Sequence, residues 1–120
     1  MHFRKKKTQE KYNTYRVNKV KKSACDFCVS EPDDKKLNFV YWKILKNMFP
    51  YDRIAEHHEL IIPKRHFKNE ADMTPEEREE LVYIKAHQLA KDKKYDFIWE
   101  NFTHIRSVEH YHLHLLSFKR

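Results

Sequence analysis

The apolar positions of this chain fall into short runs separated by polar turns. Residues 38–46 are rich in aromatic and β-branched side chains, and residues 59–63 form a second apolar run that ends at a proline. Residues 95–101 and 108–118 add two further segments, the last of which alternates polar and apolar positions. Runs of this length and composition are typical of β-strands. The pattern therefore predicts a sheet built from these four segments.

One helix is predicted between the second and third of these strands. Thr74 is suited to cap it, Pro75 fits the first helical position, and Glu77 completes a capping box. Apolar side chains then recur at helical spacing from Leu81 onward. An antiparallel sheet with one long helix packed on it is an α+β arrangement, which is the fold class we expect.

Charge is concentrated at the start of the chain. Residues 1–22 carry nine lysines and arginines against one acid, Glu10, a net charge of +8, whereas the other 98 residues sum to −1. We therefore divide the chain into a basic N-terminal arm, residues 1–22, and a folded domain, residues 23–120. A solvated, mobile tail is the simpler interpretation of the arm. The alternative is a contact with RNA or another polyanion through residues 4–22, where aromatic residues lie among the basic ones.

The composition excludes several function classes. The chain has no glycine, and both Walker-type and Rossmann phosphate loops need glycine where the backbone approaches the phosphate. No apolar run reaches the roughly 20 residues of a membrane helix, and no apolar signal segment follows the basic start. We therefore expect a cytoplasmic protein that makes no membrane contact. In such a reducing compartment, the pair Cys25 and Cys28 indicates a metal or redox role.

Three histidines, His110, His112 and His114, alternate with Tyr111 and Leu113 near the end of the chain. On a strand, alternate side chains point to the same face, so the three imidazoles are expected to share one face. They cannot all bind one zinc ion, because the first and third would lie about 13 Å apart along a strand whereas Zn–N bonds are about 2 Å long. The three histidines are therefore expected to divide their functions.

Four motifs, in this order along the chain, resemble the histidine triad (HIT) family. Residues 107–116 contain its Ser-Val pair and its His-φ-His-φ-His-φ-φ signature, where φ is apolar. Residues 58–66, His-Glu-Leu-Ile-Ile-Pro-Lys-Arg-His, resemble the family's His-x-Leu-Val-Ile-Pro-Lys-x-His segment. Residues 47–51 resemble the Asn-x-Phe-Pro-Tyr of its nucleotidyl-transferring and phosphorylase branches. The similarity covers residues 25–118 and implies a HIT-like fold.

The resemblance implies a covalent mechanism. His112 corresponds to the family nucleophile, whose imidazole attacks the α-phosphorus of a nucleoside phosphate or dinucleoside polyphosphate. The nucleotidyl-histidine is then cleaved by water or by a second phosphate. The implied catalytic positions are His110, His112, His114 and Ser107. The implied substrate-binding positions are Asn47, His58, Asn101 and Ser107, to which we add Arg106 on the grounds of its chemistry.

The loop before the triad departs from the family pattern. It is normally glycine-rich and folds around the phosphates, whereas residues 102–106 are glycine-free here. Arg106 is suited to replace a neutral donor, because a guanidinium binds phosphate through two hydrogen bonds. Homodimers are common in the family, and the resemblance extends that expectation to this chain.

The two cysteines admit three interpretations. A redox pair of the thioredoxin type would need a helix starting at the motif, yet Val-Ser-Glu-Pro follows it. Two unrelated buried thiols would not need this spacing. Zinc is favoured, because the pair supplies two thiolates and two histidines would complete a tetrahedron. Zinc-bearing HIT proteins bind the ion through two cysteines and two histidines at corresponding positions. The resemblance therefore implies a structural zinc site of Cys25, Cys28, His66 and His110.

The sequence thus predicts a nucleotide hydrolase or nucleotidyltransferase with His112 as nucleophile. The alternative is a non-catalytic, zinc-stabilised module that binds nucleotides or RNA, and a metal-dependent hydrolase is a third interpretation. An enzyme would lose turnover but keep binding when His112 is replaced. A binding module would instead respond to the loss of charge at Lys5, Lys6 and Lys7.

Overall fold

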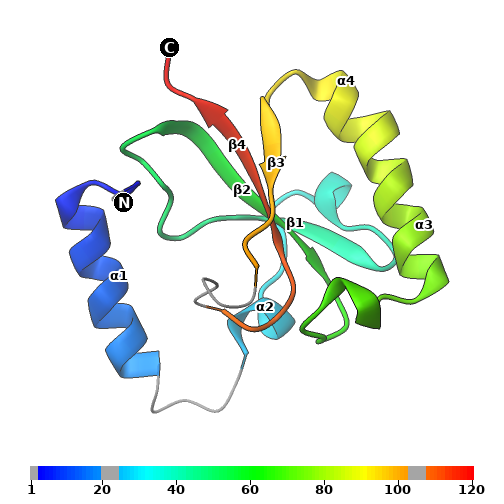
Figure 1. Ribbon diagram of the computed structural model, residues 1–120, viewed down its shortest axis with the longest axis horizontal. Helices are drawn as coiled ribbons and strands as arrows, with labels where there is room; N and C mark the ends of the chain where they lie inside the picture. The colour runs from blue at the N-terminus through cyan, green and yellow to red at the C-terminus, as the bar shows by residue number, and fades with distance from the viewer. Residues whose placement is uncertain (1–2, 20–24, 103–107) are drawn as a thin grey trace.

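The computed structural model describes residues 3–19, 25–102 and 108–120, which form a sheet with helices on either side (Figure 1). The strands are β1 (Trp42–Lys46), β2 (Ala55–Pro63), β3 (Phe97–Trp99) and β4 (Leu113–Phe118). They pair antiparallel in the spatial order β1-β2-β4-β3, so the last strand of the chain lies inside the sheet. The predicted α+β class and antiparallel sheet are confirmed.

Strand boundaries differ from the prediction where backbone groups find other partners. β1 starts four residues later than expected, because backbone N–H groups such as that of Tyr41 donate to the Glu80 carboxylate at 2.7 Å. β4 starts five residues later, because the chain before it leaves β2 and the N–H of Tyr111 donates to the carbonyl of Phe67 at 2.7 Å. β2 is longer than predicted and β3 shorter. Two of the three triad histidines therefore precede the strand.

The predicted helix is confirmed. α3 (Pro75–Ile84) continues through a π-helical turn, η3 (Lys85–Leu89), into α4 (Ala90–Asp92). The segment ends at Lys93, whose φ of 59° is in the left-handed region. Glycine usually takes that position, and a lysine takes it in this chain without glycine. Within the residues described, none of the helices combines the length and apolar character that crossing a membrane requires.

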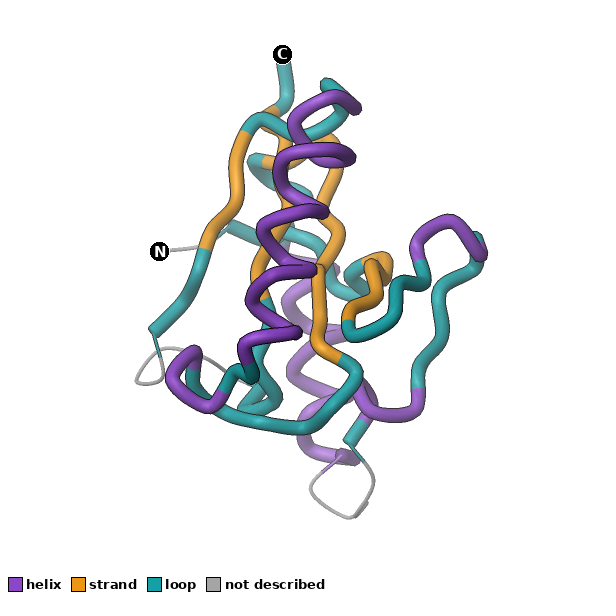
Figure 2. The backbone as a smooth tube through the Cα atoms, turned by 90° about the vertical axis from the view of Figure 1, so that its right-hand side faces the viewer, coloured by secondary structure: helices purple, strands orange, loops and turns teal. Residues whose placement is uncertain are grey.

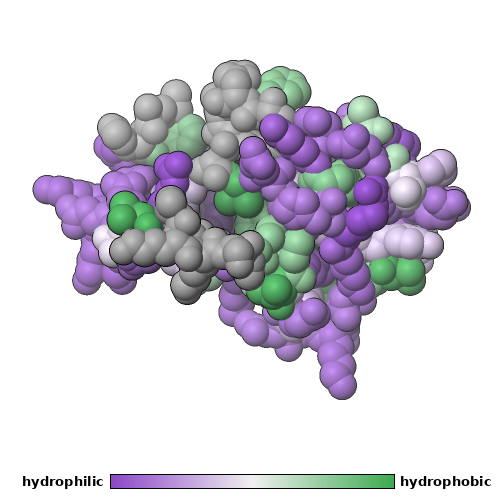
Figure 3. Space-filling view, turned by 90° about the horizontal axis from the view of Figure 1, so that it is seen from below, coloured by the Kyte–Doolittle hydropathy of each residue, from purple (hydrophilic) through white to green (hydrophobic). Residues whose placement is uncertain are grey.

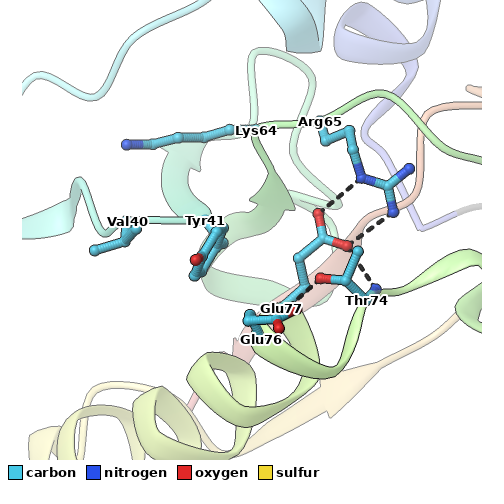
Figure 4. Close-up of a pocket in the computed structure, with 7 residues that line it drawn as sticks. All are labelled: Val40, Tyr41, Lys64, Arg65, Thr74, Glu76 and Glu77. Carbon is cyan, nitrogen blue, oxygen red and sulfur yellow. Dashed lines mark hydrogen bonds and ion pairs between the residues drawn. The ribbon is translucent and has the colours of Figure 1, made fainter.

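The start of α3 is tied to the turn that follows β2. Thr74 and Glu77 make both hydrogen bonds of the predicted capping box. The Glu77 carboxylate, which is buried, also accepts from the Arg65 guanidinium at 2.8 Å and 3.1 Å (Figure 4). Arg65 donates as well to the carbonyl of Asp72 at 2.6 Å. These bonds border a pocket of about 270 Å³ and hold the backbone that carries the neighbouring His66.

The two faces of the sheet differ in chemistry. One face packs against α3, which lies across the strands in Figure 2, and forms the main core. The core residues are Trp42, Ile44, Ile61, Phe67, Met73, Leu81, Ile84, Leu89, Tyr111, Leu113 and Leu115. The other face has a small cluster of Leu45, Leu60 and Ile62, with Phe27 packed against it. His114 lies opposite Leu60 in the β2–β4 ladder, so it belongs to this second face.

The basic arm is not the solvated tail that the sequence favoured. It contains α1 (Lys6–Lys19), which is docked against the segment before β2. The rings of Tyr12 and Tyr15 pack on Phe49 with centroids 5.2 Å and 5.1 Å away, and Phe3 also packs on aromatic neighbours. These side chains are used in contacts within the protein. The division at residues 22 and 23 lies in a segment that the structure does not describe, and it stays a prediction.

Candidate active site and metal centre

Two cysteines and two histidines converge beside α2 (Asp26–Val29), although they are far apart in the sequence. Their ligand atoms all lie within 4.8 Å of one another. The Nδ1 atom of His110 is 3.5 Å from Cys25 Sγ, 3.4 Å from Cys28 Sγ and 3.1 Å from His66 Nδ1. Cys28 Sγ is 3.2 Å from His66 Nδ1. These four side chains are close enough to hold one metal ion.

The spacing fits a tetrahedral ion. Zn–S bonds of about 2.3 Å and Zn–N bonds of about 2.0–2.1 Å at tetrahedral angles put neighbouring ligand atoms about 3.4–3.8 Å apart. His110 is also oriented for such a role, because its Nε2 lies 2.8 Å from the carbonyl oxygen of Pro63. The Nε2–H donates there, which leaves the lone pair on Nδ1, the atom that faces the cysteines. Hydrogen bonding of this kind to the outer nitrogen is typical of metal-binding histidines.

The surroundings of the cluster are partly apolar. Burial lowers the pKa of His110 to about 4, although the bond to the Pro63 carbonyl acts in the opposite direction. Burial and the adjacent Cys25 thiol raise the pKa of the Cys28 thiol. The buried ammonium of Lys43 donates to the carbonyl of Ser30 at 2.6 Å, just after α2. Lys43 and the apolar contacts of Phe27 thus attach the short helix α2 to the sheet.

His112 is oriented by a backbone carbonyl. Its Nδ1 lies 2.8 Å from the carbonyl oxygen of His110, so Nδ1 carries the proton and donates to that oxygen. The lone pair is then on Nε2. The ring of Phe27 meets the His112 ring edge to face at 5.1 Å, and His112 is buried. In its neutral form, an imidazole oriented with its lone pair on Nε2 is chemically a nucleophile or a proton acceptor.

A second pair of histidines lies beside it on the same face of the sheet. The backbone N–H of Tyr51 donates to Nδ1 of His58 at 2.9 Å, so the proton of this imidazole is on Nε2. His58 Nε2 lies 2.8 Å from Nδ1 of His114 and donates to it. The remaining proton of His114 is therefore on Nε2, which lies 3.2 Å from the side-chain amide of Asn101. One backbone amide thus sets the tautomers of both rings.

Both rings of this pair are kept neutral. Burial lowers the pKa of His58 to about 3, and the positive charge of Arg4 adds to the effect. Burial lowers the pKa of His114 in the same way, with further contributions from His112 and His58. The side-chain amide of Asn47 lies 3.2 Å from His58 Nε2. Histidine and amide groups thus line this side of the site with neutral hydrogen-bonding atoms.

The free energy of unfolding should fall as the pH drops below about 6.5. An unfolded imidazole binds its proton near a pKa of about 6.5, whereas native His58 binds it only near about 3. Between these values the unfolded state holds more protons, so stability is full above pH 6.5 and is lost as the pH falls, by about 1.4 kcal/mol per pH unit for each such imidazole. Urea unfolding between pH 7.5 and pH 5 measures this slope.

A matched pair of variants isolates the contribution of the histidine pair. His114→Gln should reduce the slope by about 1.4 kcal/mol per pH unit, whereas His57→Gln, which changes an exposed histidine of β2, should leave it unchanged. Equal slopes in wild type and His114→Gln would contradict the neutral state of the buried pair.

The structure sorts the predicted residues into groups. His110 lies in the cluster with Cys25, Cys28 and His66, and its carbonyl accepts from His112. His114 lies with His58, Asn47 and Asn101. Two predicted positions, Arg106 and Ser107, lie outside the described residues. The three triad histidines thus lie in different surroundings, and the division of their functions stays a prediction.

Two residues of the site were missed by the sequence analysis. Tyr51, whose ring stacks on His114 at 5.4 Å, belongs to the quoted Asn-Met-Phe-Pro-Tyr segment and was given no role. Phe27 lies between the two cysteines in the sequence and was not singled out, yet its ring packs on His112 at 5.1 Å. Both signals were present in the motifs themselves.

Comparison with known proteins gives a family and a fold. The HIT domain family model matches residues 33–120. A HIT family hydrolase from Legionella pneumophila is 27% identical, with a TM-score of 0.53, over 69% of this chain and 79% of its own. A histidine triad protein from Clostridium difficile is 21% identical, with a TM-score of 0.59, over 83% of this chain and 96% of its own.

A third solved structure shares the fold. The histidine triad nucleotide-binding protein from Candida albicans is 22% identical, with a TM-score of 0.56, over 77% of this chain and 73% of its own. No curated protein matches the chain.

Proposed function

The chain belongs to the HIT domain family, as its motifs predicted, and from that premise we propose that it is a nucleotide hydrolase or nucleotidyltransferase acting through His112. One observation carries the proposal. The hydrogen bond from His112 Nδ1 to the His110 carbonyl leaves the lone pair on Nε2, in a ring that lies 5.1 Å from that of His114. The 27% identical neighbour, described as a hydrolase, supports the same class of activity.

The reaction has two steps. His112 Nε2 attacks the α-phosphorus of a nucleoside phosphate in line, the N–P bond forms, and the bond to the leaving group breaks with its electron pair on the leaving group. The imidazole becomes positively charged, and the His110 carbonyl stabilises that charge through the Nδ1–H. Water, or a second phosphate, then attacks the phosphorus, and the N–P electron pair returns to Nε2.

The surrounding residues hold the phosphate and the nucleoside. The Nε2–H of His114, directed away from His58, is suited to donate to a phosphate oxygen. The Asn101 amide lies beside this nitrogen, and we assign it the same phosphate. We assign the ribose to Asn47 and His58, whose side chains lie 3.2 Å apart. Ser107 is proposed to donate to the leaving group, and Arg106 to the charged oxygens. His110 contributes through its carbonyl and through the metal cluster.

We propose that the cluster of Cys25, Cys28, His66 and His110 holds a structural zinc ion. Its two thiolates and two imidazoles leave no ligand position for substrate, so the ion would serve to tie α2 to the segments on either side of the sheet. A cytoplasmic location and a homodimer belong to the same proposal, on the grounds of composition and family membership.

Intact-protein mass spectrometry at short reaction times tests the covalent step. The substrates are a nucleoside phosphoramidate, a dinucleoside polyphosphate and a nucleoside diphosphate sugar. Wild type should gain the mass of one nucleotidyl group, which also identifies the transferred group, and His112→Ala should gain none. Nucleotide binding with neither adduct nor turnover on any of the three would reject the enzyme in favour of the non-catalytic binding module.

A further inference from the structure

α1 is fastened to a single short segment, residues 49–53, at several points. The Asp52 carboxylate accepts from the backbone N–H of Lys5 at 2.8 Å and from the Thr8 hydroxyl at 2.5 Å. Arg4 donates through Nε to the carbonyl of Phe49 at 2.7 Å, and Arg53 donates its N–H to the carbonyl of Phe3 at 2.9 Å. With Tyr12 and Tyr15 on the Phe49 ring, the helix has a fixed position relative to this segment.

That segment also forms a wall of the proposed site. The ring of Tyr51 stacks on His114, with centroids 5.4 Å apart and an interplanar angle of 23°. The guanidinium of Arg4, just before α1, lies 5.0 Å from the centroid of the same ring. One aromatic layer therefore separates the start of α1 from the histidine pair. The charge of Arg4 reaches the pair as well, because it helps to lower the pKa values of both rings.

The outward side chains of the helix are basic. Lys5, Lys6, Lys7, Lys11 and Arg16 are all exposed, and Glu10 is the one acid in residues 3–18. Figure 3 shows hydrophilic side chains projecting at the end of the molecule that carries α1. The first turn of α1 has no acidic residue, so its lysines oppose the helix dipole. This charge therefore costs the helix some stability, and it is exposed to an external anion.

The chemistry of the helix selects among anionic partners. A helix that lies on a membrane needs an apolar face opposite its basic one. The aromatic residues of α1 instead face Phe49 within the protein, and Val17 is its one exposed large aliphatic side chain among those described. Its 14 residues extend about 21 Å, a length that faces about six phosphates of one nucleic-acid strand.

We propose that α1 binds the phosphate backbone of a nucleic-acid strand whose terminal nucleotide occupies the His112 site. The inference rests on the proposed function, and it narrows the substrate class from nucleoside phosphates to nucleotidyl groups at the end of a strand. Lysines that contact phosphates confer no base preference. Binding should therefore depend on strand length and salt, and little on sequence.

The test compares two triple variants of equal charge change. Lys6→Gln, Lys7→Gln and Lys11→Gln remove charge from α1, whereas Lys36→Gln, Lys85→Gln and Lys91→Gln remove it from exposed positions on other elements. Fluorescence anisotropy measures the binding of a labelled 12-nucleotide single strand between 50 and 300 mM salt. The α1 variant should bind at least about tenfold more weakly at low salt, and its salt slope should fall by about 2, or roughly 0.7 for each lost contact.

Kinetics provide the second readout. We compare kcat/KM for a nucleotidyl group at the end of the 12-mer with kcat/KM for the free nucleoside phosphoramidate. The ratio of the first to the second should fall in the α1 variant and stay at the wild-type value in the control variant. Equal losses in both variants would show an effect of net charge and overturn the proposal. Binding to phosphatidylglycerol vesicles in place of the oligonucleotide would also overturn it.

A last variant separates this inference from the proposed function. His112→Ala should bind the 12-mer as wild type does, because the strand is held mainly by α1. If the protein forms no adduct, the anisotropy measurement still tests whether α1 binds the strand. If adducts form on mononucleotides while the α1 variant binds the 12-mer like wild type, the strand-binding role fails and the catalytic role stands.

Discussion

Replacing His112 with alanine should reduce turnover of nucleoside phosphates by on the order of 10⁴-fold or more, because removal of a catalytic nucleophile typically has an effect of this size. The loss should appear in kcat, since the proposed interaction forms only when Nε2 bonds to phosphorus. Steady-state kinetics with a nucleoside phosphoramidate measure it, and titration calorimetry should show that the nucleotide still binds.

A matched control separates the nucleophile from a general loss of structure. His87→Ala changes an exposed histidine on η3, and it should keep wild-type kinetics. Circular dichroism should show that both variants are folded. Residual activity of His112→Ala within about tenfold of wild type would refute the assignment and direct attention to another group, with His114 as the next candidate because its ring lies 5.1 Å from that of His112.

Much of this site could be predicted from the sequence, because its chemistry is local. The alternation at residues 110–114 placed three imidazoles in one short segment, and the spacing expected along a strand argued against one shared ion, although only His114 lies in β4. The capping box at Thr74 and Glu77 was equally local, and both of its hydrogen bonds are present. Such features depend on residues within four positions of each other, where backbone geometry fixes the spacing.

Other features depend on contacts that spacing does not encode. The charge of the arm indicated exposure, yet Asp52 and Phe49, more than 30 residues away, hold α1 in place. Glu77 also has a contact that spacing does not encode. The sequence identified it as part of a cap, and in the structure it pairs with Arg65 as well. For the metal ligands, the resemblance to a family linked the cysteines to His66 and His110, which no periodicity relates.

Removing the metal should produce the largest change in stability. Zinc is expected at one ion per chain, and treatment with a chelator should lower Tm by roughly 10–20 °C. The reason is that α2 has no fully buried residue of its own, so the ion would supply much of what fixes it to His66 and His110. Without the ion, two sulfur atoms and two imidazole rings would also remain crowded together without the bonds that the ion would supply. Elemental analysis and thermal unfolding measure the two quantities.

Two exposed histidines provide the matched comparison for this effect. His66→Gln removes a ligand and should lower both zinc content and Tm, whereas His57→Gln should change neither. Phe27, held between the cysteines, packs on His112 at 5.1 Å, so loss of the ion should also weaken nucleotide binding. Zinc well below one per chain in wild type, with a Tm unchanged by chelator, would mean that the four side chains are held together by Lys43 and the apolar cluster alone. The link between metal and site would then have to be abandoned, while the role of His112, which rests on its bond to the His110 carbonyl, would remain open to its own test.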